Sequence, residues 1–184
     1  EELYMRIIAG DAKGRNLYTP KNQDVRPTGD RVKESIFSMI DSYIEDAVVV
    51  DMFAGTGNLG LESISRGARE AYFIDNKYTS IEIVKKNIES TGYTKESHVI
   101  HANYEKAIKN LNIKADIIFL DPPYNKGHIN NCLRLISQYG ILSSKGIIVI
   151  EHSTDEIWEN ISDFELLKSK KYGITMISIL KNLV

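Results

Sequence analysis

The stretch Asp121-Pro122-Pro123-Tyr124 places a carboxylate, two prolines and an aromatic ring directly after the apolar residues 117–120. The prolines fix the backbone angle φ and remove two amide donors, so the carbonyl groups of this corner remain available as acceptors. Such acceptors beside a ring suit an exocyclic NH2 group on a planar base that stacks on the ring. Hydrogen bonds from the two amine protons to Asp121 and the Pro122 carbonyl would direct the nitrogen lone pair towards an electrophile.

A glycine-rich stretch, Asp51-Met52-Phe53-Ala54-Gly55-Thr56-Gly57-Asn58-Leu59-Gly60, follows another apolar run. Its glycines satisfy G-x-G-x-x-G, a pattern that lets the backbone come close to a bound molecule where a helix begins. Asp75, 24 residues after Asp51, could accept hydrogen bonds from ribose hydroxyls. This spacing alone fits NAD as well as any other adenosine cofactor.

The carboxylate of Asp51 favours one of these cofactors. A carboxylate that faces the glycine loop would repel a pyrophosphate but would receive an ammonium group, directly or through water. S-adenosylmethionine has an amino-acid head group of that kind and no phosphate, and its sulfonium methyl group is an electrophile. We therefore expect this cofactor. An aspartate that only caps its own turn is the structural alternative.

A regular alternation of strands and helices must position these groups. Apolar strand candidates at 48–53, 71–74, 98–101, 115–120 and 146–151 alternate with helical patterns near 59–66, 79–91, 103–110 and 128–139. This rhythm indicates an α/β fold: a doubly wound, mostly parallel, seven-stranded sheet with helices on both faces, a Rossmann-like arrangement. Residues 164–180 break the rhythm and predict a closing antiparallel hairpin around residues 170–173.

In such a sheet, ligands bind beyond the carboxyl ends of the strands, and the fourth strand lies next to the first. The Asp121 corner and the glycine loop should therefore face one pocket. That position weakens the alternative in which the two prolines merely end a strand and Tyr124 covers the core.

Other polar residues give weaker signals. Asn103 follows the third strand and could reach an adenine edge, but it could equally cap the next helix. His98 and His101 alternate with apolar residues and are read as strand residues. We expect no metal site, because no acids or histidines have the spacing of metal ligands. Cys132, the single cysteine, cannot form an internal disulfide and lies on a helical pattern.

Composition and charge limit which functions are possible. The chain of 184 residues is 42% hydrophobic, and none of its apolar runs approaches the roughly 18 residues that cross a bilayer, so we expect a soluble, cytoplasmic protein. A net charge of −2 argues against a general nucleic-acid binder. Residues 5–33, however, hold seven basic residues against three acids. This segment is either a solvated face or a basic arm that grips a phosphate backbone, and residues 5–8 and 16–18 predict a small β-hairpin within it.

Four segments in order resemble one family: RIIAGDAKGRNL (6–17), RPTGDRVKESIF (26–37), DMFAGTGNLGLE (51–62) and VIEHS (149–153). With FLDPPY they resemble the RsmD type of class I S-adenosylmethionine-dependent amino-methyltransferases, from Arg6 to Leu180. The resemblance implies methyl transfer to the exocyclic N2 amine of a specific guanine in bacterial small-subunit (16S) ribosomal RNA. The implied partner is that RNA or the assembling small ribosomal subunit, bound by a monomer.

The resemblance also implies roles for residues. Residues 5–27 would be a basic hairpin that faces RNA, and residues 28–184 the methyltransferase domain. Asp75 departs from the family pattern, in which glutamate is more frequent, so it would reach only one ribose hydroxyl. The implied catalytic residues are Asp121, Pro122, Pro123 and Tyr124; the cofactor-binding residues Asp51, Phe53, Gly55, Gly57, Asp75, Asn76, Asn103 and Asp121; and the RNA-binding residues Arg6, Lys13, Arg15, Arg26, Thr28 and Arg31.

Rival functions remain open at this point. An adenine-N6 methyltransferase acting on DNA or RNA could use the same Asp-Pro-Pro-Tyr corner, although a DNA enzyme ordinarily needs a target-recognition domain for which 184 residues leave little room. A non-catalytic RNA-binding module would have no need of the intact corner. A nicotinamide dehydrogenase would need an acid or base for hydride transfer, and none follows the glycine loop.

Overall fold

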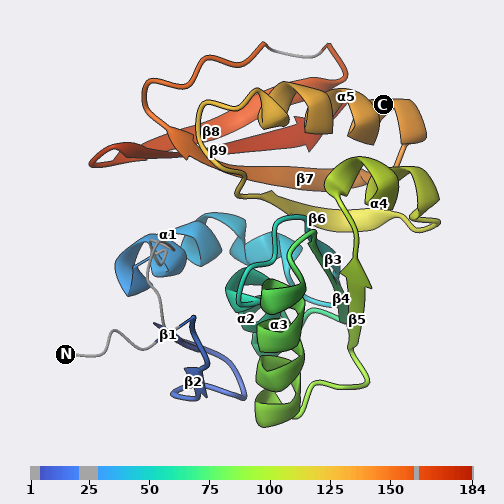
Figure 1. Ribbon diagram of the computed structural model, residues 1–184. Helices are drawn as coiled ribbons and strands as arrows, with labels where there is room; N and C mark the ends of the chain where they lie inside the picture. The colour runs from blue at the N-terminus through green and yellow to red at the C-terminus, as the bar shows by residue number, and fades with distance from the viewer. Residues whose placement is uncertain (1–4, 21–28, 160–161, 184) are drawn as a thin grey trace.

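The computed structural model describes residues 5–20, 29–159 and 162–183. Within them, one sheet lies between two layers of helices, and a small hairpin packs at the N-terminal side (Figure 1). The order of the seven strands in this sheet is β5-β4-β3-β6-β7-β9-β8. The strands are β3 (Val48–Asp51), β4 (Glu70–Asp75), β5 (Ser97–His101), β6 (Ala115–Leu120), β7 (Leu142–Ser153), β8 (Phe164–Tyr172) and β9 (Thr175–Asn182).

The pairing of these strands confirms the predicted fold class. Strands β3 to β7 are parallel to one another, and β9 is antiparallel to both β7 and β8. The helices cover the two faces and lie close to their predicted ranges. They are α1 (Asp30–Ile40), α2 (Asn58–Ser65), α3 (Tyr78–Thr91), α4 (Tyr104–Asn110) and α5 (His128–Tyr139), with a short 3-10 helix η1 (Asp41–Tyr43).

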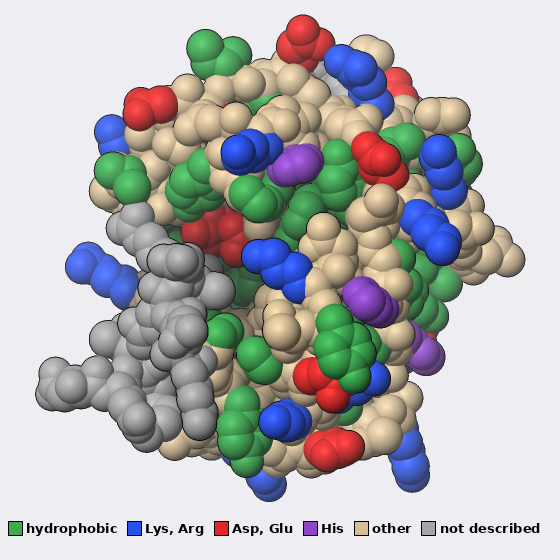
Figure 2. Space-filling view, viewed as in Figure 1, with side chains coloured by type: hydrophobic (Ala, Val, Ile, Leu, Met, Phe, Trp, Pro, Cys, Tyr) green, Lys and Arg blue, Asp and Glu red, His purple; other side chains and the backbone are tan. Residues whose placement is uncertain are grey.

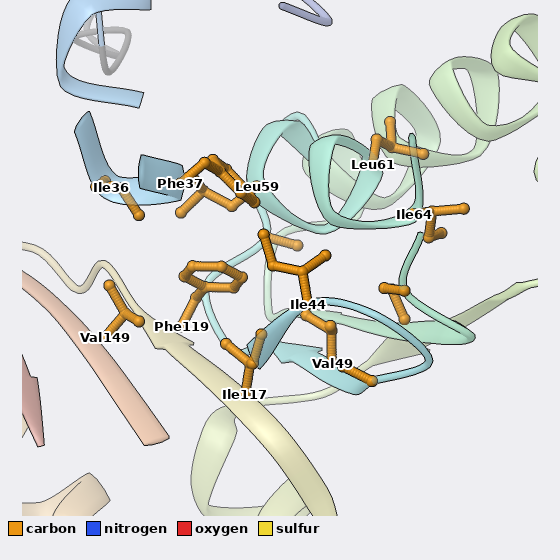
Figure 3. Packing of buried hydrophobic residues seen from close by; sticks show 14 of the residues in the cluster. Ile36, Phe37, Ile44, Val49, Leu59, Leu61, Ile64, Ile117, Phe119 and Val149 are labelled. Atoms are coloured by element: carbon orange, nitrogen blue, oxygen red, sulfur yellow. The ribbon is translucent and has the colours of Figure 1, made fainter. Parts of the chain in front are cut away.

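Two hydrophobic clusters, one on each face of the sheet, explain the uninterrupted apolar strands. Val49 packs with α1, α2 and α3, whereas the next residue, Val50, packs with α4 and α5. Because successive side chains of a strand point to opposite faces, a sheet covered on both sides must be apolar at every position. In Figure 3, Phe119 of β6 lies beside Phe37 of α1, and their ring centroids are 6.0 Å apart.

Several strand boundaries differ from the predicted ones: β3 ends at Asp51 rather than at residue 53, and β7 ends at Ser153 rather than at residue 151. Strand β7 begins at Leu142 rather than at residue 146, because its first residues pair with β6 across an irregular register. The closing hairpin is confirmed, but β8 continues to Tyr172, and Gly173, with φ of +60°, makes a two-residue turn with Ile174. Glycine takes such a positive φ without the steric strain of a side chain.

The N-terminal hairpin joins β1 (Met5–Arg6) to β2 (Asn16–Leu17), as predicted. Its residues Ile7 and Leu17 are buried in the cluster that contains α1, α2 and α3. Asn87 of α3, fully buried, accepts a hydrogen bond from Tyr18 N at 2.6 Å and donates one to Thr56 O at 2.8 Å. The hairpin is therefore tied to the glycine loop as well as to the helices.

A buried carboxylate, Glu62 of α2, holds the same region together. Its oxygens lie 3.0 Å from Lys33 Nζ and 2.8 Å from Arg66 Nε. They also accept hydrogen bonds from the amides of Ile8 at 2.9 Å and Ala9 at 3.0 Å. Burial lowers the pKa of Lys33, and the charge of Glu62 opposes that shift. The hairpin, α1 and α2 thus share one ionic centre.

None of the helices in the described ranges has the length and apolar character that crossing a bilayer requires. Cys132 of α5 is fully buried, as its helical pattern predicted, and burial raises the pKa of its thiol. His98 lies in β5 and stacks on Tyr72, with ring centroids 4.4 Å apart. In the described part of the chain, no three or more His, Cys, Asp or Glu side chains are arranged so that they could hold a metal ion.

Replacing Glu62 by glutamine should destabilise the fold. The change keeps the size of the side chain but leaves Lys33 buried without its counter-charge, so we expect a loss of about 3–5 kcal/mol. Urea unfolding measures this loss. The control is Glu82→Gln, which removes an exposed partner of Lys85 and should cost less than about 1 kcal/mol. Equal losses in the two variants would contradict the role of the ionic centre.

Candidate active site

The carboxyl ends of β3 and β6 lie side by side at the point where the strand order reverses. Asp51 pairs in register with Phe119, and Met52 N donates to Phe119 O at 3.1 Å. From β3 the chain proceeds to β4 and β5 on one side, and β6 and β7 lie on the other. Ligand crevices of open α/β sheets form at such a switch point. The expected adjacency of the glycine loop and the Asp121 corner is thereby confirmed.

The glycine loop turns sharply between β3 and α2. Gly55 and Gly57 have φ of +58° and +80°, and Gly57 N donates to Ala54 O at 2.7 Å. A Cβ atom added at Gly60 would lie 2.3 Å from the Phe73 ring, so this glycine allows α2 to pack on β4. A Cβ at Gly55 would meet nothing nearer than 4.0 Å. The loop is therefore packed on one side and open to a ligand at Gly55.

Asp51 ends β3 with its side chain buried. Its Oδ2 accepts a hydrogen bond from Gly60 N at 3.1 Å, the turn-bracing role that the sequence left as an alternative. Burial, with the nearby charge of Asp75, raises the pKa of Asp51 to about 7, and the Gly60 hydrogen bond opposes this shift. Bringing a cation to this carboxylate would favour its ionised form.

Asp75 ends β4 and faces the same loop. Its Oδ2 accepts from Gly55 N at 2.9 Å, and its Oδ1 accepts from Lys77 N at 2.8 Å. Each carboxylate oxygen has a further lone pair for another donor. Asn76 is exposed next to it, and its carbonyl oxygen lies 3.1 Å from His101 Nε2. Asp75 thus fixes the open part of the loop from the neighbouring strand.

Asn103 caps α4, with Oδ1 accepting from Lys106 N at 2.8 Å. The residue after it, Tyr104, forms an aromatic group with Phe53 and His128. The ring centroid of Phe53 lies 5.4 Å from that of Tyr104 and 6.3 Å from that of His128. Of these three residues, only Phe53 was predicted from the sequence. Tyr104 and His128 are each the first residue of a helix that follows a strand, and this position was the signal available in the sequence.

The Asp121 corner continues from β6, and Pro122 is buried whereas Pro123 is exposed. Burial raises the pKa of Asp121 well above its usual range, and the charges of Glu151 and Asp51 add to the shift. The Tyr124 ring is half-buried. Its hydroxyl donates to Glu151 Oε1 at 3.3 Å and lies 3.3 Å from Thr175 Oγ1.

Three carboxylates therefore gather at the ends of neighbouring strands: Asp51 on β3, Asp121 after β6 and Glu151 on β7. Residues 149–153 resemble a family motif, but the sequence alone indicates no role for Glu151 or Thr175. An acid near the carboxyl end of the next strand was the missed signal. In Figure 2, acidic side chains lie within a hollow of the surface, and lysine and arginine side chains are scattered around it. Such a site favours cationic and hydrogen-bond-donating ligands.

The candidate RNA-binding residues lie on and near the N-terminal hairpin. Arg6 Nε is 2.8 Å from Asp30 Oδ2, and Arg15 donates to Ser90 O at 2.7 Å. Lys13 and Arg31 are exposed. Two further candidates, Arg26 and Thr28, lie outside the described residues.

Comparisons with known proteins agree with the fold. The model of a family described as Conserved hypothetical protein 95 matches residues 5–181. YlbH of Bacillus subtilis, named as a candidate rRNA methyltransferase, is 38% identical over 96% of this chain and 98% of its own length. Ribosomal RNA small subunit methyltransferase D of Haemophilus influenzae is 32% identical over 97% of this chain and 94% of its own length. The structure of yhhF of Escherichia coli, titled as a candidate methyltransferase, superposes with a TM-score of 0.88 and 28% identity, over 97% of this chain and 98% of that one.

Replacing Asp51 by asparagine should change how stability depends on pH in the ligand-free protein. The carboxyl titrates near 3.8 when unperturbed and near 7 when folded, so between these values the unfolded chain has released a proton that the folded chain keeps. Stability of the natural chain therefore falls as the pH rises through this window. Between pH 5 and pH 8 it should lose roughly 2.5 kcal/mol more than Asp51→Asn loses.

Urea unfolding at the two pH values measures this difference. The control is Asp46→Asn, which changes an aspartate whose side chain is 74% exposed and should leave the natural pH dependence unaltered. If Asp51→Asn behaved as Asp46→Asn does, the carboxyl of Asp51 would not be held in a perturbed state.

Proposed function

The chain belongs to the RsmD-type family, and on that premise we propose that it transfers a methyl group from S-adenosylmethionine to the exocyclic N2 amine of a specific guanine in small-subunit (16S) ribosomal RNA. The proposal includes a cytoplasmic monomer that acts on this RNA or on the assembling small subunit. The methyltransferase names of two relatives that span nearly the whole chain support the reaction type and the RNA substrate.

One observation supports the proposal most directly. The Asp121 corner and the glycine loop follow adjacent strands, which pair in register at Asp51 and Phe119. A cofactor held by the loop and a base held by the corner would therefore meet at one edge of the sheet. Alignment of two reactants in this way is the main contribution that a protein makes to a direct displacement.

The residues present fit S-adenosylmethionine. The buried carboxylate of Asp51 suits the ammonium group of the amino-acid head, whose positive charge would favour the ionised state. The open backbone at Gly55 leaves space for the ligand, and the carboxylate of Asp75 has lone pairs left for a ribose hydroxyl. Asn76 and Asn103 flank the adenine side in this proposal, with Phe53 and Gly57 beside them.

The corner would hold the target amine. When bound, the cofactor supplies a methyl group on a positively charged sulfur, which keeps the electron pair of the broken bond. Asp121 and the Pro122 carbonyl would accept hydrogen bonds from the two N–H groups of the amine, and the Tyr124 ring would stack on the base. Pro123 keeps this turn rigid. The amine loses one proton on methylation, and the elevated pKa of Asp121 suits its carboxylate to accept that proton.

The target base must leave its stack to reach Tyr124, which is easiest in loops and bulges of RNA. Arg6, Lys13, Arg15, Arg26, Thr28 and Arg31 would contact RNA around the entrance. Because the chain has a net charge of −2, this contact would depend on local positive charge and weaken steeply as salt increases.

Calorimetric titration followed by mass mapping tests this function. We expect the purified protein to bind S-adenosylhomocysteine and not NAD, since Asp51 would repel a pyrophosphate. Incubation with S-adenosylmethionine and undermethylated small ribosomal subunits should then give one new N2-methylguanine. Binding of NAD alone would refute the cofactor. Methylation of adenine N6 instead would keep the cofactor and refute the base.

Replacing Asp121 by alanine should separate catalysis from cofactor binding. The variant loses the acceptor for the amine proton, so we expect kcat for methylation to fall about 100-fold or more, with S-adenosylhomocysteine affinity nearly unchanged. Asp155→Ala, which changes an exposed aspartate beyond the end of β7, is the control and should keep full activity. Full activity of Asp121→Ala would remove the corner from the mechanism.

A further inference from the structure

We propose that the tip of the β8–β9 hairpin is a second RNA-contact surface, in which Lys170 and Lys171 bind the phosphate backbone of the ribosomal RNA beside the active site. This inference rests on the proposed function and adds a surface that lies far from the N-terminal arm in the sequence. The surface consists of residues 168–174 and is called the β8–β9 tip below.

The β8–β9 tip lies beside the carboxyl ends of the parallel strands, where the active site is. Strand β9 runs antiparallel to β7, and its first residue, Thr175, pairs with Ser153, the last residue of β7. The turn at Gly173 and Ile174 is therefore next to the carboxyl end of β7. Thr175 Oγ1 is also 3.3 Å from the Tyr124 hydroxyl, so the tip directly adjoins the corner that would hold the target base.

The charge of the tip suits RNA. Residues 168–174 contain Lys168, Lys170 and Lys171, all exposed, and no acid. Lys168 and Lys170 pair with Ile179 and Ile177, which belong to the cluster on the α1 side, and Lys171 points to the opposite face. Positive charge thus borders both faces of an edge strand. Glu165, an acid earlier on β8, forms an ion pair with Lys181, with 2.7 Å between Glu165 Oε2 and Lys181 Nζ.

Contacts with α1 fix the position of Lys170. Its Nζ lies 3.4 Å from Ser35 Oγ and 5.4 Å from the centroid of the Tyr172 ring, and the Tyr172 hydroxyl is also bonded to Ser35. A side chain held in this way loses less conformational freedom when it binds a phosphate. Lysines on an edge strand also oppose pairing with other chains, but that task does not require a fixed position.

The tip extends the basic surface assigned to the N-terminal segment. Arg31 precedes Ser35 by four residues in α1, so both lie on one side of the helix, and Arg31 is exposed. Since Ser35 contacts Lys170, the Arg31 position is close to the tip. In Figure 1 the tip projects beyond the sheet on the side where α1 lies. The exposed side chain of Ile174, which is 56% accessible, adds an apolar contact for a ribose or an unstacked base.

A charge-matched pair of double variants tests the inference. The test variant is Lys170→Gln with Lys171→Gln, in which glutamine keeps the edge strand polar. The control is Lys95→Gln with Lys109→Gln, which removes equal charge from exposed sites before β5 and at the end of α4, near the amino ends of strands. Binding of 16S ribosomal RNA transcribed in vitro is measured over a series of salt concentrations. Thermal unfolding and S-adenosylhomocysteine titration check the fold and the cofactor site.

We expect the test variant to bind the RNA about tenfold more weakly near 0.1 M salt, and the slope of log affinity against log salt to become shallower by about 1 to 2. The control should bind as the natural protein does, and Tm and S-adenosylhomocysteine affinity should not change in either. If the test variant matches the control, the β8–β9 tip does not contact RNA and the proposed function stands. If the natural protein neither binds this RNA nor methylates undermethylated small ribosomal subunits, both proposals fail together.

Discussion

The buried charge of Glu62 is the constraint on which the arrangement of the molecule depends. Two basic side chains and two backbone amides from the hairpin satisfy this carboxylate. Removing Glu62 would leave the ammonium group of Lys33 buried without a counter-charge. Because Glu62 belongs to α2, whose first turn ends the glycine loop, the same centre positions the cofactor side of the site and the basic hairpin. Asn87 adds a second link between these parts through Thr56.

The carboxylates of this chain fall into two environments with opposite chemistry. Glu62 is buried among cations and donors, as a structural acid must be. At the strand ends Asp51 is buried and Asp121 is partly buried, other acids lie nearby, and the pKa values of both rise. Ionisable groups with strongly shifted pKa values, whose unfavourable surroundings a bound ligand would improve, are frequent at functional sites. The carboxylates in unfavourable electrostatic surroundings therefore lie at the strand ends, where the ligands would bind.

Local patterns were sufficient to predict the fold and the adjacency of the two motifs, because strand periodicity and the rules of parallel sheets determine which strand ends meet. They were insufficient where partners are far apart in sequence. Lys33 counted as part of a basic arm, yet its ammonium group is buried against Glu62. Glu151 and Thr175 bond Tyr124 from two later strands, and no spacing near residue 124 indicates them. From the sequence, Asn103 could contact an adenine or cap the next helix, and only the structure shows that its side chain accepts a hydrogen bond from Lys106 N.

The burial of Cys132 has a practical consequence. The sequence contains one cysteine, and its thiol is enclosed in α5 with a raised pKa, so it has little thiolate at neutral pH. A cysteine introduced at an exposed position would therefore react with maleimide reagents far faster than the native thiol. Fluorescent or spin labels could be attached one at a time to the hairpins without first removing a native residue, so that distances between them could be followed in solution.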